Sequence, residues 1–352
     1  MGTRIGIEQI QMGMVIDKPI YKQNGVLLVT SQTRITPRIK ELLKEYLVEH
    51  VEIAAKQVDP IETSVEAIKE TKAFKAFDEG LLTTTQNLKS TLSYVVNTDE
   101  ELDVQALVAE IDNLFKTANN NIQLLDMMYC IRNYDDLTYT HSVNVALMCH
   151  IMGRWLGLSQ EDIQVLSLCG LLHDVGKTQI PQEIITKPGK LTKEEFDVIK
   201  LHPIKSYTIL EKQDVDERIK AAAYMHHERC DGTGYPRGLK GEQIHEFAKI
   251  ITIIDVYDAM TADRVYRKGM CPFRVIEVLM DEGFEKYDPR YLLLFLERIT
   301  ETYINKPVRL NNGQEGKIVM INKNDLSRPV VQVGNEYVNL SIHKQLMVEA
   351  IL

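Results

Sequence analysis

A cluster of imidazoles and carboxylates is the first sign of chemistry in this chain of 352 residues. Six of its nine histidines lie between residues 141 and 227. His226 and His227 are adjacent, and Glu228 and Asp231 follow them in a glycine-rich loop that ends in proline. Neutral imidazole is the commonest metal ligand in proteins, and carboxylates either complete a metal site or orient its histidines. The spacing therefore indicates a metal site.

Further candidate ligands lie on or beside apolar helical segments. His173 and Asp174 follow residues 161–172, which are apolar on most sides and typical of a buried helix. An isolated His-Asp pair is equally well read as a core histidine with a capping aspartate. Buried histidines and aspartates are costly, however, unless they are paired or bind a metal. A shared site therefore explains the whole set best, namely His141, His173, Asp174, His202, His226, His227 and Asp255.

Composition and charge restrict the class of protein. Hydrophobic residues make up 44% of the chain and charged residues 26%, which is typical of a soluble globular protein. The net charge of −9 argues against an extended basic surface for a nucleic acid polymer. Five cysteines without C-x-x-C spacing indicate reduced thiols, although Cys230 is an alternative metal ligand. Because no leader or membrane-length apolar segment is visible, we expect a cytoplasmic protein without a membrane partner.

The first half of the chain predicts two segments. Residues 1–55 predict a small α+β N-terminal module, with a hairpin turn at Asn24-Gly25, a helix at 37–49 and a strand at 50–53. Residues 56–128 are polar and helical in character, and predict a helical linker or bundle, with homodimerisation as the alternative role. Thr98 and Glu101 have the spacing of a capping box, which predicts a helix start there.

The second half predicts a helical core followed by a β-rich segment. Residues 129–304 contain the candidate ligands, and a helix over 249–262 places Asp255 and Asp258 on one face. Gly176 is expected to end the helix that precedes it. Residues 305–352 predict a small β-rich C-terminal domain of barrel-like form. Its strand-like runs are 308–310, 316–321, 330–333 and 337–340.

Two motifs resemble a known family. Residues 173–177, His-Asp-Val-Gly-Lys, and the loop 226–236 together resemble the HD-GYP subgroup of the HD phosphohydrolases. Residues 139–146 and 255–267 also match, so the resemblance covers about 129–300. The family implies a mainly α fold with an HD-type helical catalytic core, a binuclear or trinuclear centre of iron or manganese, and hydrolysis of cyclic dinucleotides, chiefly cyclic di-GMP.

The resemblance also implies roles for individual residues. It makes the seven candidates the metal ligands, with Asp174 as catalytic bridge between metals. Lys177 would contact the scissile phosphate, and Arg264, Arg267 and Tyr235 would bind substrate. Asp258 would orient a metal ligand through a hydrogen bond without binding the metal itself, and Glu228 or Asp231 would do the same. Trinuclear members carry a glutamate where this chain has Leu137, so we predict two divalent metal ions, with Asp135 or Asp136 as a substitute ligand being the alternative.

The expected reaction is attack by a metal-bridged hydroxide on phosphorus, which yields linear pGpG, with further cleavage to GMP left open. Cyclic GMP-AMP is an alternative substrate. A second alternative is an HD hydrolase of other nucleotides, which needs only His141, His173, Asp174 and Asp255. A third is a catalytically inactive scaffold that binds cyclic dinucleotide and signals through protein partners.

Overall fold

The computed structural model describes residues 3–7, 10, 14, 16–21, 27–29, 33, 35, 37–46, 48, 50–53, 65–98, 100–131, 137–263 and 268–352. The chain divides into two compact units, an N-terminal unit, Met1–Thr63, and a C-terminal unit, Ser64–Leu352. The finer division at residues 55, 128 and 304 stays a prediction. Among the residues described, no helix is both long enough and apolar enough to cross a membrane.

The N-terminal unit combines short strands with one helix, as predicted. Its elements are β1 (Thr3–Gly6), β2 (Ile20–Tyr21), β3 (Leu27–Val29), α1 (Pro37–Glu45) and β4 (His50–Ile53). β1 pairs with β4 and β2 with β3, both antiparallel. The second pair is the predicted hairpin, whose turn residues Asn24 and Gly25 lie outside the described residues. α1 ends before the predicted residue 49, because the chain must leave the helix to enter β4.

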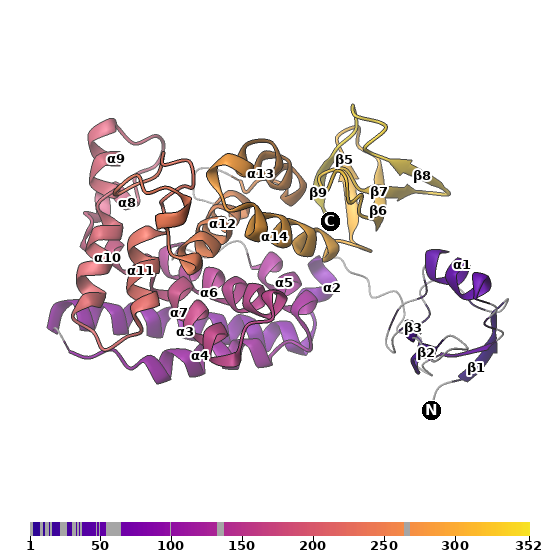
Figure 1. Cartoon of the computed structure of the whole chain (residues 1–352), viewed down its shortest axis with the longest axis horizontal. Coiled ribbons are helices and arrows are strands. Elements are labelled where there is room, and N and C mark those ends of the chain that lie inside the picture. Colours follow the sequence, from indigo (N-terminus) through magenta and orange to yellow (C-terminus); the bar gives the residue numbers. More distant parts are fainter. Residues whose placement is uncertain are drawn as a thin grey trace. The chain divides into compact units, whose positions relative to one another are not determined.

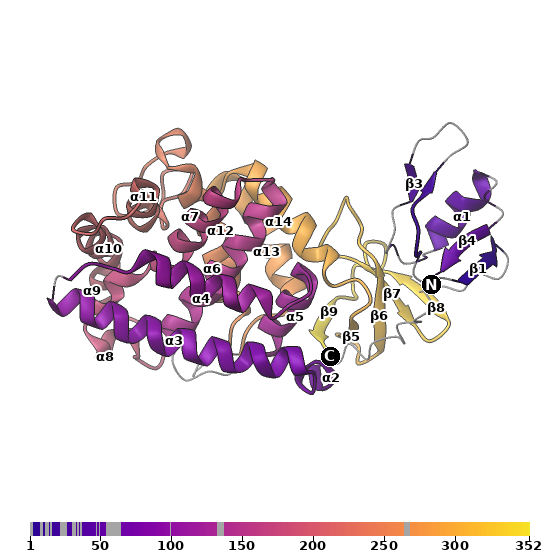
Figure 2. The same cartoon turned by 90° about the horizontal axis from the view of Figure 1, so that it is seen from below.

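The C-terminal unit is a helical bundle that carries a small sheet at one end (Figure 1). In the view from below, the long helix α3 runs along the lower edge of the helical unit (Figure 2). The helices are α2 (Val65–Lys69), α3 (Lys72–Thr98), α4 (Val104–Lys116), α5 (Asn121–Cys130), α6 (Leu137–Leu156), α7 (Gln160–Leu172), α8 (Gln182–Ile185), α9 (Lys193–Ile199), α10 (His202–Glu211), α11 (Glu217–Met225), α12 (Glu246–Thr261), α13 (Pro272–Lys286) and α14 (Pro289–Glu301), with two short 3₁₀ helices, η2 (Val175–Gln179) and η3 (Gly241–Gln243).

The predicted helix start at Thr98 is wrong. Thr98 is the last residue of α3, where its hydroxyl donates a hydrogen bond to the carbonyl of Tyr94. The next helix, α4, begins at Val104, because the carboxylate of Asp103 accepts a hydrogen bond from the backbone N–H of Ala106 and caps it. The predicted apolar face of that helix is confirmed, with Leu107, Ile111 and Leu114 buried.

The C-terminal segment forms one antiparallel five-stranded sheet in the order β8-β7-β6-β5-β9. Within residues 307–352 this order leaves β8 and β9 as the two edges, so the sheet does not close as the barrel-like prediction required. The strands are β5 (Pro307–Leu310), β6 (Glu315–Met320), β7 (Val330–Val333), β8 (Glu336–Asn339) and β9 (Val348–Ile351). β9 was not predicted. The apolar side chains under the sheet, such as Val308 and Ile318, belong to the same hydrophobic core as the helices.

Candidate metal centre

The seven predicted ligands come from five segments of the C-terminal unit, and the structure brings them together. Their side chains are supplied by α6, the end of α7, the start of α10, the end of α11 and the middle of α12. They are His141, His173, Asp174, His202, His226, His227 and Asp255. The prediction of a shared location from sequence is therefore met by the geometry.

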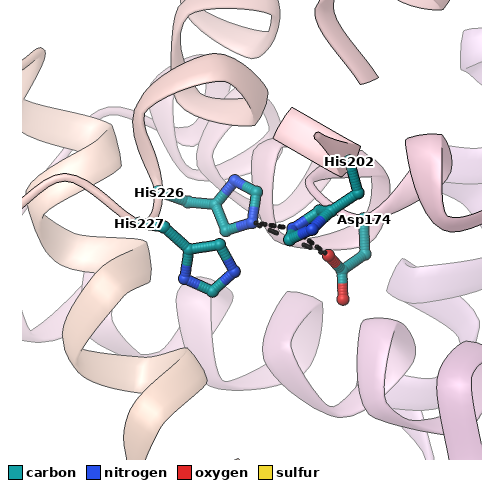
Figure 3. Close-up of side chains that lie close together, drawn as sticks. All are labelled: Asp174, His202, His226 and His227. Carbon is teal, nitrogen blue, oxygen red and sulfur yellow. Dashed lines mark hydrogen bonds and ion pairs between the residues drawn. The ribbon is translucent and has the colours of Figure 1, made fainter. Parts of the chain in front are cut away.

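The first cluster consists of Asp174, His202, His226 and His227, which each offer a ligand atom within 4.8 Å of the others (Figure 3). Nε2 of His202 lies 3.1 Å from Oδ1 of Asp174 and 3.1 Å from Nε2 of His226. Three of the four side chains are buried, and that of His227 is partly exposed. The ligand atoms of this cluster therefore converge at a site that is mostly shielded from solvent.

The second cluster consists of His141, His173 and Asp174. Asp174 belongs to both clusters, with Oδ1 facing His202 and Oδ2 lying 3.3 Å from Nε2 of His173. Asp255 lies between the clusters, since its Oδ1 is 2.9 Å from Nε2 of His141 and its Oδ2 is 3.9 Å from Nδ1 of His227. The site thus has two halves that share one carboxylate.

Three of the histidines are oriented in the same way. In each, Nδ1 lies at hydrogen-bond distance from the backbone carbonyl three residues earlier. A carbonyl only accepts, so Nδ1 carries the proton and Nε2 keeps its lone pair for a metal. The pairs are His173 with Gly170 at 2.7 Å, His202 with Ile199 at 2.7 Å, and His226 with Ala223 at 2.9 Å. The turns that precede these residues therefore set the tautomer that metal binding requires.

This orientation leaves lone pairs facing one another at the centre of the site. Nε2 of His173 and Oδ1 of Asp174 are buried and have no hydrogen-bond partner among the residues described. Buried acceptors without a donor are costly, and native proteins rarely leave them unsatisfied. A divalent cation would satisfy them, and a set of imidazoles and carboxylates suits iron, manganese and related ions. The residues present therefore fit the predicted metal centre.

Both carboxylates of the site are ionised at neutral pH. Burial would raise the pKa of Asp174, but the neighbouring His173 and the ammonium of Lys177 hold that pKa well below its usual value. Burial likewise opposes ionisation of Asp255, yet the hydrogen bond and charge of His141 keep its pKa low. Lys177 pairs directly with Oδ2 of Asp174. A carboxylate in this state needs no deprotonation before it binds a metal.

The histidines of the two clusters differ in charge. Burial lowers the pKa of His226 to about 4 and holds that of His227 well below its usual value, so both are neutral at pH 7. Burial also opposes protonation of His141, but its hydrogen bonds to Asp255 and Asp258 outweigh burial and raise its pKa to about 10. His141 therefore keeps a proton that a metal must displace, whereas the first cluster is ready to bind.

The residues predicted to orient ligands differ in what they contact. Oδ2 of Asp258 lies 2.7 Å from Nδ1 of His141, a placement that suits the predicted role. Glu228 is buried, but its two oxygens accept the backbone N–H groups of Arg237 and Leu239 at 2.7 and 2.8 Å. These two contacts hold the loop closed, and the role of Glu228 in orienting a ligand stays a prediction.

Asp231 contacts Thr233 in the glycine-rich loop, and its predicted role in orienting a ligand stays a prediction. Its side chain is exposed, and its Oδ1 accepts hydrogen bonds from the backbone N–H and the hydroxyl of Thr233 at 2.8 and 2.7 Å. Those are the contacts of an Asx turn, in which an aspartate stabilises the two residues that follow it. Asp231 therefore shapes the glycine-rich loop from its outer side.

The glycine-rich loop folds back against its own first residues. A Cβ on Gly234 would lie 2.5 Å from the carbonyl oxygen of His227, so only glycine fits there. The next residue, Tyr235, donates its backbone N–H to that carbonyl, and its ring stacks on the His227 ring at 4.7 Å with the planes 30° apart. Burial raises the pKa of the Tyr235 phenol, so it stays neutral. Its contact with substrate stays a prediction.

The three predicted cationic contacts to substrate are placed only in part. Lys177 lies on η2 beside Asp174, and 27% of its side chain is exposed, so it can reach a bound ligand. Arg264 and Arg267 lie outside the described residues. The roles of all three stay predictions.

Gly176 has a packing role that the sequence did not reveal. The expected helix end lies earlier, since α7 ends at Leu172, and Gly176 falls within η2. A Cβ on Gly176 would lie 2.2 Å from the carbonyl oxygen of His202 and 2.4 Å from the backbone nitrogen of Ser206. The hydroxyl of Ser206 accepts the N–H of Gly176 at 2.8 Å. This contact brings α10, and with it His202, against Asp174.

We expect Gly176→Ala to disturb both folding and metal binding. The new methyl group must push α10 away from η2, and overpacking of this kind costs about 1–3 kcal/mol. Thermal melting and metal analysis of the variant would check the effect. Gly157→Ala is the matched control, because a Cβ there meets nothing within 4 Å although the φ of 70° carries its own strain. Equal metal content and melting temperature in Gly176→Ala and the wild type would contradict the packing argument.

The amino-acid sequence of this chain is similar to those of several known proteins. Residues 124–291 match the HD domain. The cyclic di-GMP phosphodiesterase PA4108 of Pseudomonas aeruginosa is 29% identical over 95% of this chain and 85% of its own length. The 3′3′-cGAMP-specific phosphodiesterase 1 of Vibrio cholerae is 41% identical, over 41% of this chain and 34% of its own length.

The fold of this chain is also similar to that of a solved structure. An HDG"Y"P protein from Bdellovibrio bacteriovorus superposes with a TM-score of 0.55 at 17% sequence identity. The match covers 84% of this chain and 99% of that one. The predicted fold class, mainly α with an HD-type helical core and a β-rich C-terminal segment, is confirmed.

Proposed function

We propose that the chain belongs to the HD-GYP subgroup of the HD-domain family and that it is a metal-dependent phosphodiesterase, which hydrolyses cyclic di-GMP to linear pGpG. The observation that carries the proposal is the pair of ligand clusters that share Asp174. A phosphodiester is negatively charged, and a site with two cations can hold both its attacking and its leaving oxygen. The relatives' names agree with a cyclic dinucleotide as substrate.

Different residues of this chain would have different roles in the proposed reaction. Bound divalent ions would supply Lewis acidity, which lowers the pKa of water and neutralises phosphoryl oxygens. Asp174 offers one oxygen to each cluster, and the backbone carbonyls behind three histidines hold their Nε2 atoms toward it. Lys177 can swing its ammonium from Asp174 to a phosphoryl oxygen, where positive charge stabilises the transition state. Tyr235 covers the His227 ring and limits access of bulk water there.

We propose two ions of iron or manganese per chain, one for each cluster. The one-ion alternative, an HD hydrolase of other nucleotides, uses neither His202 nor the pair at 226–227. Each of those three imidazoles offers a ligand atom within 4.8 Å of one on Asp174, which favours a second ion over three separately satisfied histidines. The inactive-scaffold alternative is disfavoured because every predicted ligand is present and in contact with another.

The substrate assay tests the proposal directly. The metal-loaded protein is mixed with cyclic di-GMP under argon, and the products are separated by chromatography. We expect linear pGpG, with GMP appearing later if a second cleavage follows. Chelation of the metal should abolish product, and readdition should restore it. No linear product from the reconstituted protein would contradict the proposal.

Cyclic GMP-AMP is the second candidate substrate, which the similarity to the Vibrio cholerae enzyme favours. Both substrates are offered together at equal concentration, and the ratio of the two linear products gives the ratio of the two kcat/KM values. We expect cyclic di-GMP to be consumed first. Preferential consumption of cyclic GMP-AMP would replace the proposed substrate but leave the proposed chemistry in place.

We further propose that the protein acts in the cytoplasm, where its five cysteines would stay reduced. Homodimerisation through the segment 56–128 and signalling-protein partners also remain proposals. Leu82 and Tyr94 are exposed on α3 and would serve such a contact. Light scattering of the wild type across a concentration series is the measurement that decides between monomer and dimer.

A further inference from the structure

Phe196 is a large exposed ring beside the candidate metal centre. It lies on α9, and 47% of its surface is accessible. Its ring centroid is 6.5 Å from that of Tyr235, with the planes at 77°. The ring of Tyr235 in turn stacks on His227. A continuous line of aromatic rings therefore leads from a candidate ligand to the protein surface.

α9 holds this ring in a fixed place. Thr192 and Glu195 form a capping box at the start of the helix, and Lys187 donates to both oxygens of Glu195 at 2.7 Å. The chain then passes directly into α10, whose first residue is the candidate ligand His202. In Figure 1, α8, α9 and α10 lie together at the end of the helical unit away from the sheet. The ring is thus anchored to the element that carries a ligand.

The near-perpendicular rings of Phe196 and Tyr235 form a corner. A flat aromatic group that lies on one ring meets the other with its edge, a favourable arrangement for aromatic pairs. The ammonium of Lys200 lies over the Phe196 ring, 5.4 Å from its centroid, and pairs with Asp197. The corner therefore suits the flat ring system of a purine base.

A single exposed apolar side chain is common and by itself needs no explanation. Phe196 is distinguished by its position beside the candidate metal centre rather than by its exposure. In a cyclic dinucleotide every phosphodiester is flanked by nucleosides, so a phosphate at the metal centre brings a purine base near its rim. Base stacking on aromatic side chains is a general means of holding nucleotides. An exposed ring next to Tyr235 stands where that base must go.

We propose that Phe196 stacks on a purine base of the substrate, with Tyr235 at the edge of that base. The inference rests on the proposed function, since it assigns a base-binding position to the same site. Phe196 binds substrate here and takes no part in the chemical step. Its loss should therefore affect KM far more than kcat.

Steady-state kinetics with cyclic di-GMP tests this. Phe196→Ala should raise KM about 5- to 150-fold, the range expected for loss of one base–aromatic stack, with kcat changed less. Phe196→Tyr should restore a KM near that of the wild type, and Phe196→Leu should not, because leucine is apolar but has no ring. Phe284→Ala, which removes an equally exposed ring (41%) on α13, is the matched control and should leave KM unchanged.

A spectroscopic arm distinguishes substrate contact from a structural role. The Phe196→Trp variant places an indole at the proposed contact, and its fluorescence should change when cyclic di-GMP is added in stopped flow before turnover. The native Trp155 in the wild type gives the background. A Phe196→Ala variant with unchanged KM, or one whose raised KM comes with lost metal or a lowered melting temperature, would overturn the inference while the proposed function stands.

Failure of the proposed function itself would look different. In that case the wild type would turn over no cyclic dinucleotide, yet the fluorescence titration would still report binding. Nucleotide binding with a fluorescence change would support the role of Phe196 in a non-hydrolytic protein. Absence of any change at saturating nucleotide would overturn it.

Discussion

Asp174→Asn is expected to lose at least about 10³-fold in kcat and to bind far less metal than the wild type. Asp174 is the one side chain shared by the two ligand clusters, so its charge serves both ions. Loss of a residue that only orients a ligand already costs about 10–100-fold, and a shared ligand must cost more. Elemental analysis and product chromatography on the same preparation would measure both effects.

The fold should survive this change. Asparagine has nearly the same shape as aspartate, although Lys177 loses its partner and the metal-free protein loses the stabilisation that a depressed pKa provides above pH 4. Circular dichroism should therefore show native helix content. Asp281→Asn, an exposed carboxylate on α13, is the matched control and should keep full activity. Wild-type turnover in Asp174→Asn would place the chemistry elsewhere.

Metal binding to the second cluster should become about 100-fold tighter between pH 7 and pH 9, while binding to the first cluster changes little. His141 has a pKa raised to about 10, so at pH 7 it is protonated in the metal-free protein. A metal must displace that proton, and below pH 10 the apparent affinity gains about tenfold for each unit by which pH rises. His226, with a pKa lowered to about 4, is already neutral across this range.

Titration of the metal-free protein with manganese under argon at several pH values measures the two affinities. Asp258→Asn is the informative variant, because Asp258 is one of the two carboxylates that raise the pKa of His141. Its removal should lower that pKa and flatten the pH dependence of the weaker ion. Equal pH dependence for both ions, or none for either, would contradict the assignment of the proton to His141.

The ligand set is the part of the site that the sequence predicts best. A histidine beside an aspartate at the end of an apolar helix is ambiguous alone. Together with two adjacent histidines before a glycine-rich loop, it favours a shared metal site. The partners that fix the histidine tautomers are backbone carbonyls three residues earlier, such as that of Gly170. Any residue supplies a carbonyl, so no sequence pattern marks them.

Contacts that depend on tertiary packing are the ones that the sequence could not predict. Glu228 and Asp231 look alike in the sequence, yet one is buried with both oxygens on the backbone of Arg237 and Leu239, and the other is exposed in a turn. The difference depends on where the loop folds back, which is a tertiary property. Glycine favours helix ends, so the sequence predicts a helix end at Gly176. The close approach of Gly176 to His202 depends instead on how α10 packs.

The helix start at Thr98 shows the limit of local signals in another way. Thr98 and Asp103 are both good capping residues, and five positions separate them in a polar stretch. The choice between them depends on how far α3 continues before its buried face ends at Val95. The end of α3 is therefore set by the burial of its side chains along the whole helix, which the capping pattern alone does not reveal.

The most direct test of the central claim, a two-ion site built around Asp174, is an anaerobic metal titration in which bound metal and pGpG formation are measured together. The two-cluster geometry predicts about two ions per chain at saturation, and turnover of cyclic di-GMP that appears only as the second ion binds. Full turnover with about one ion per chain, or two bound ions without any linear product, would contradict it.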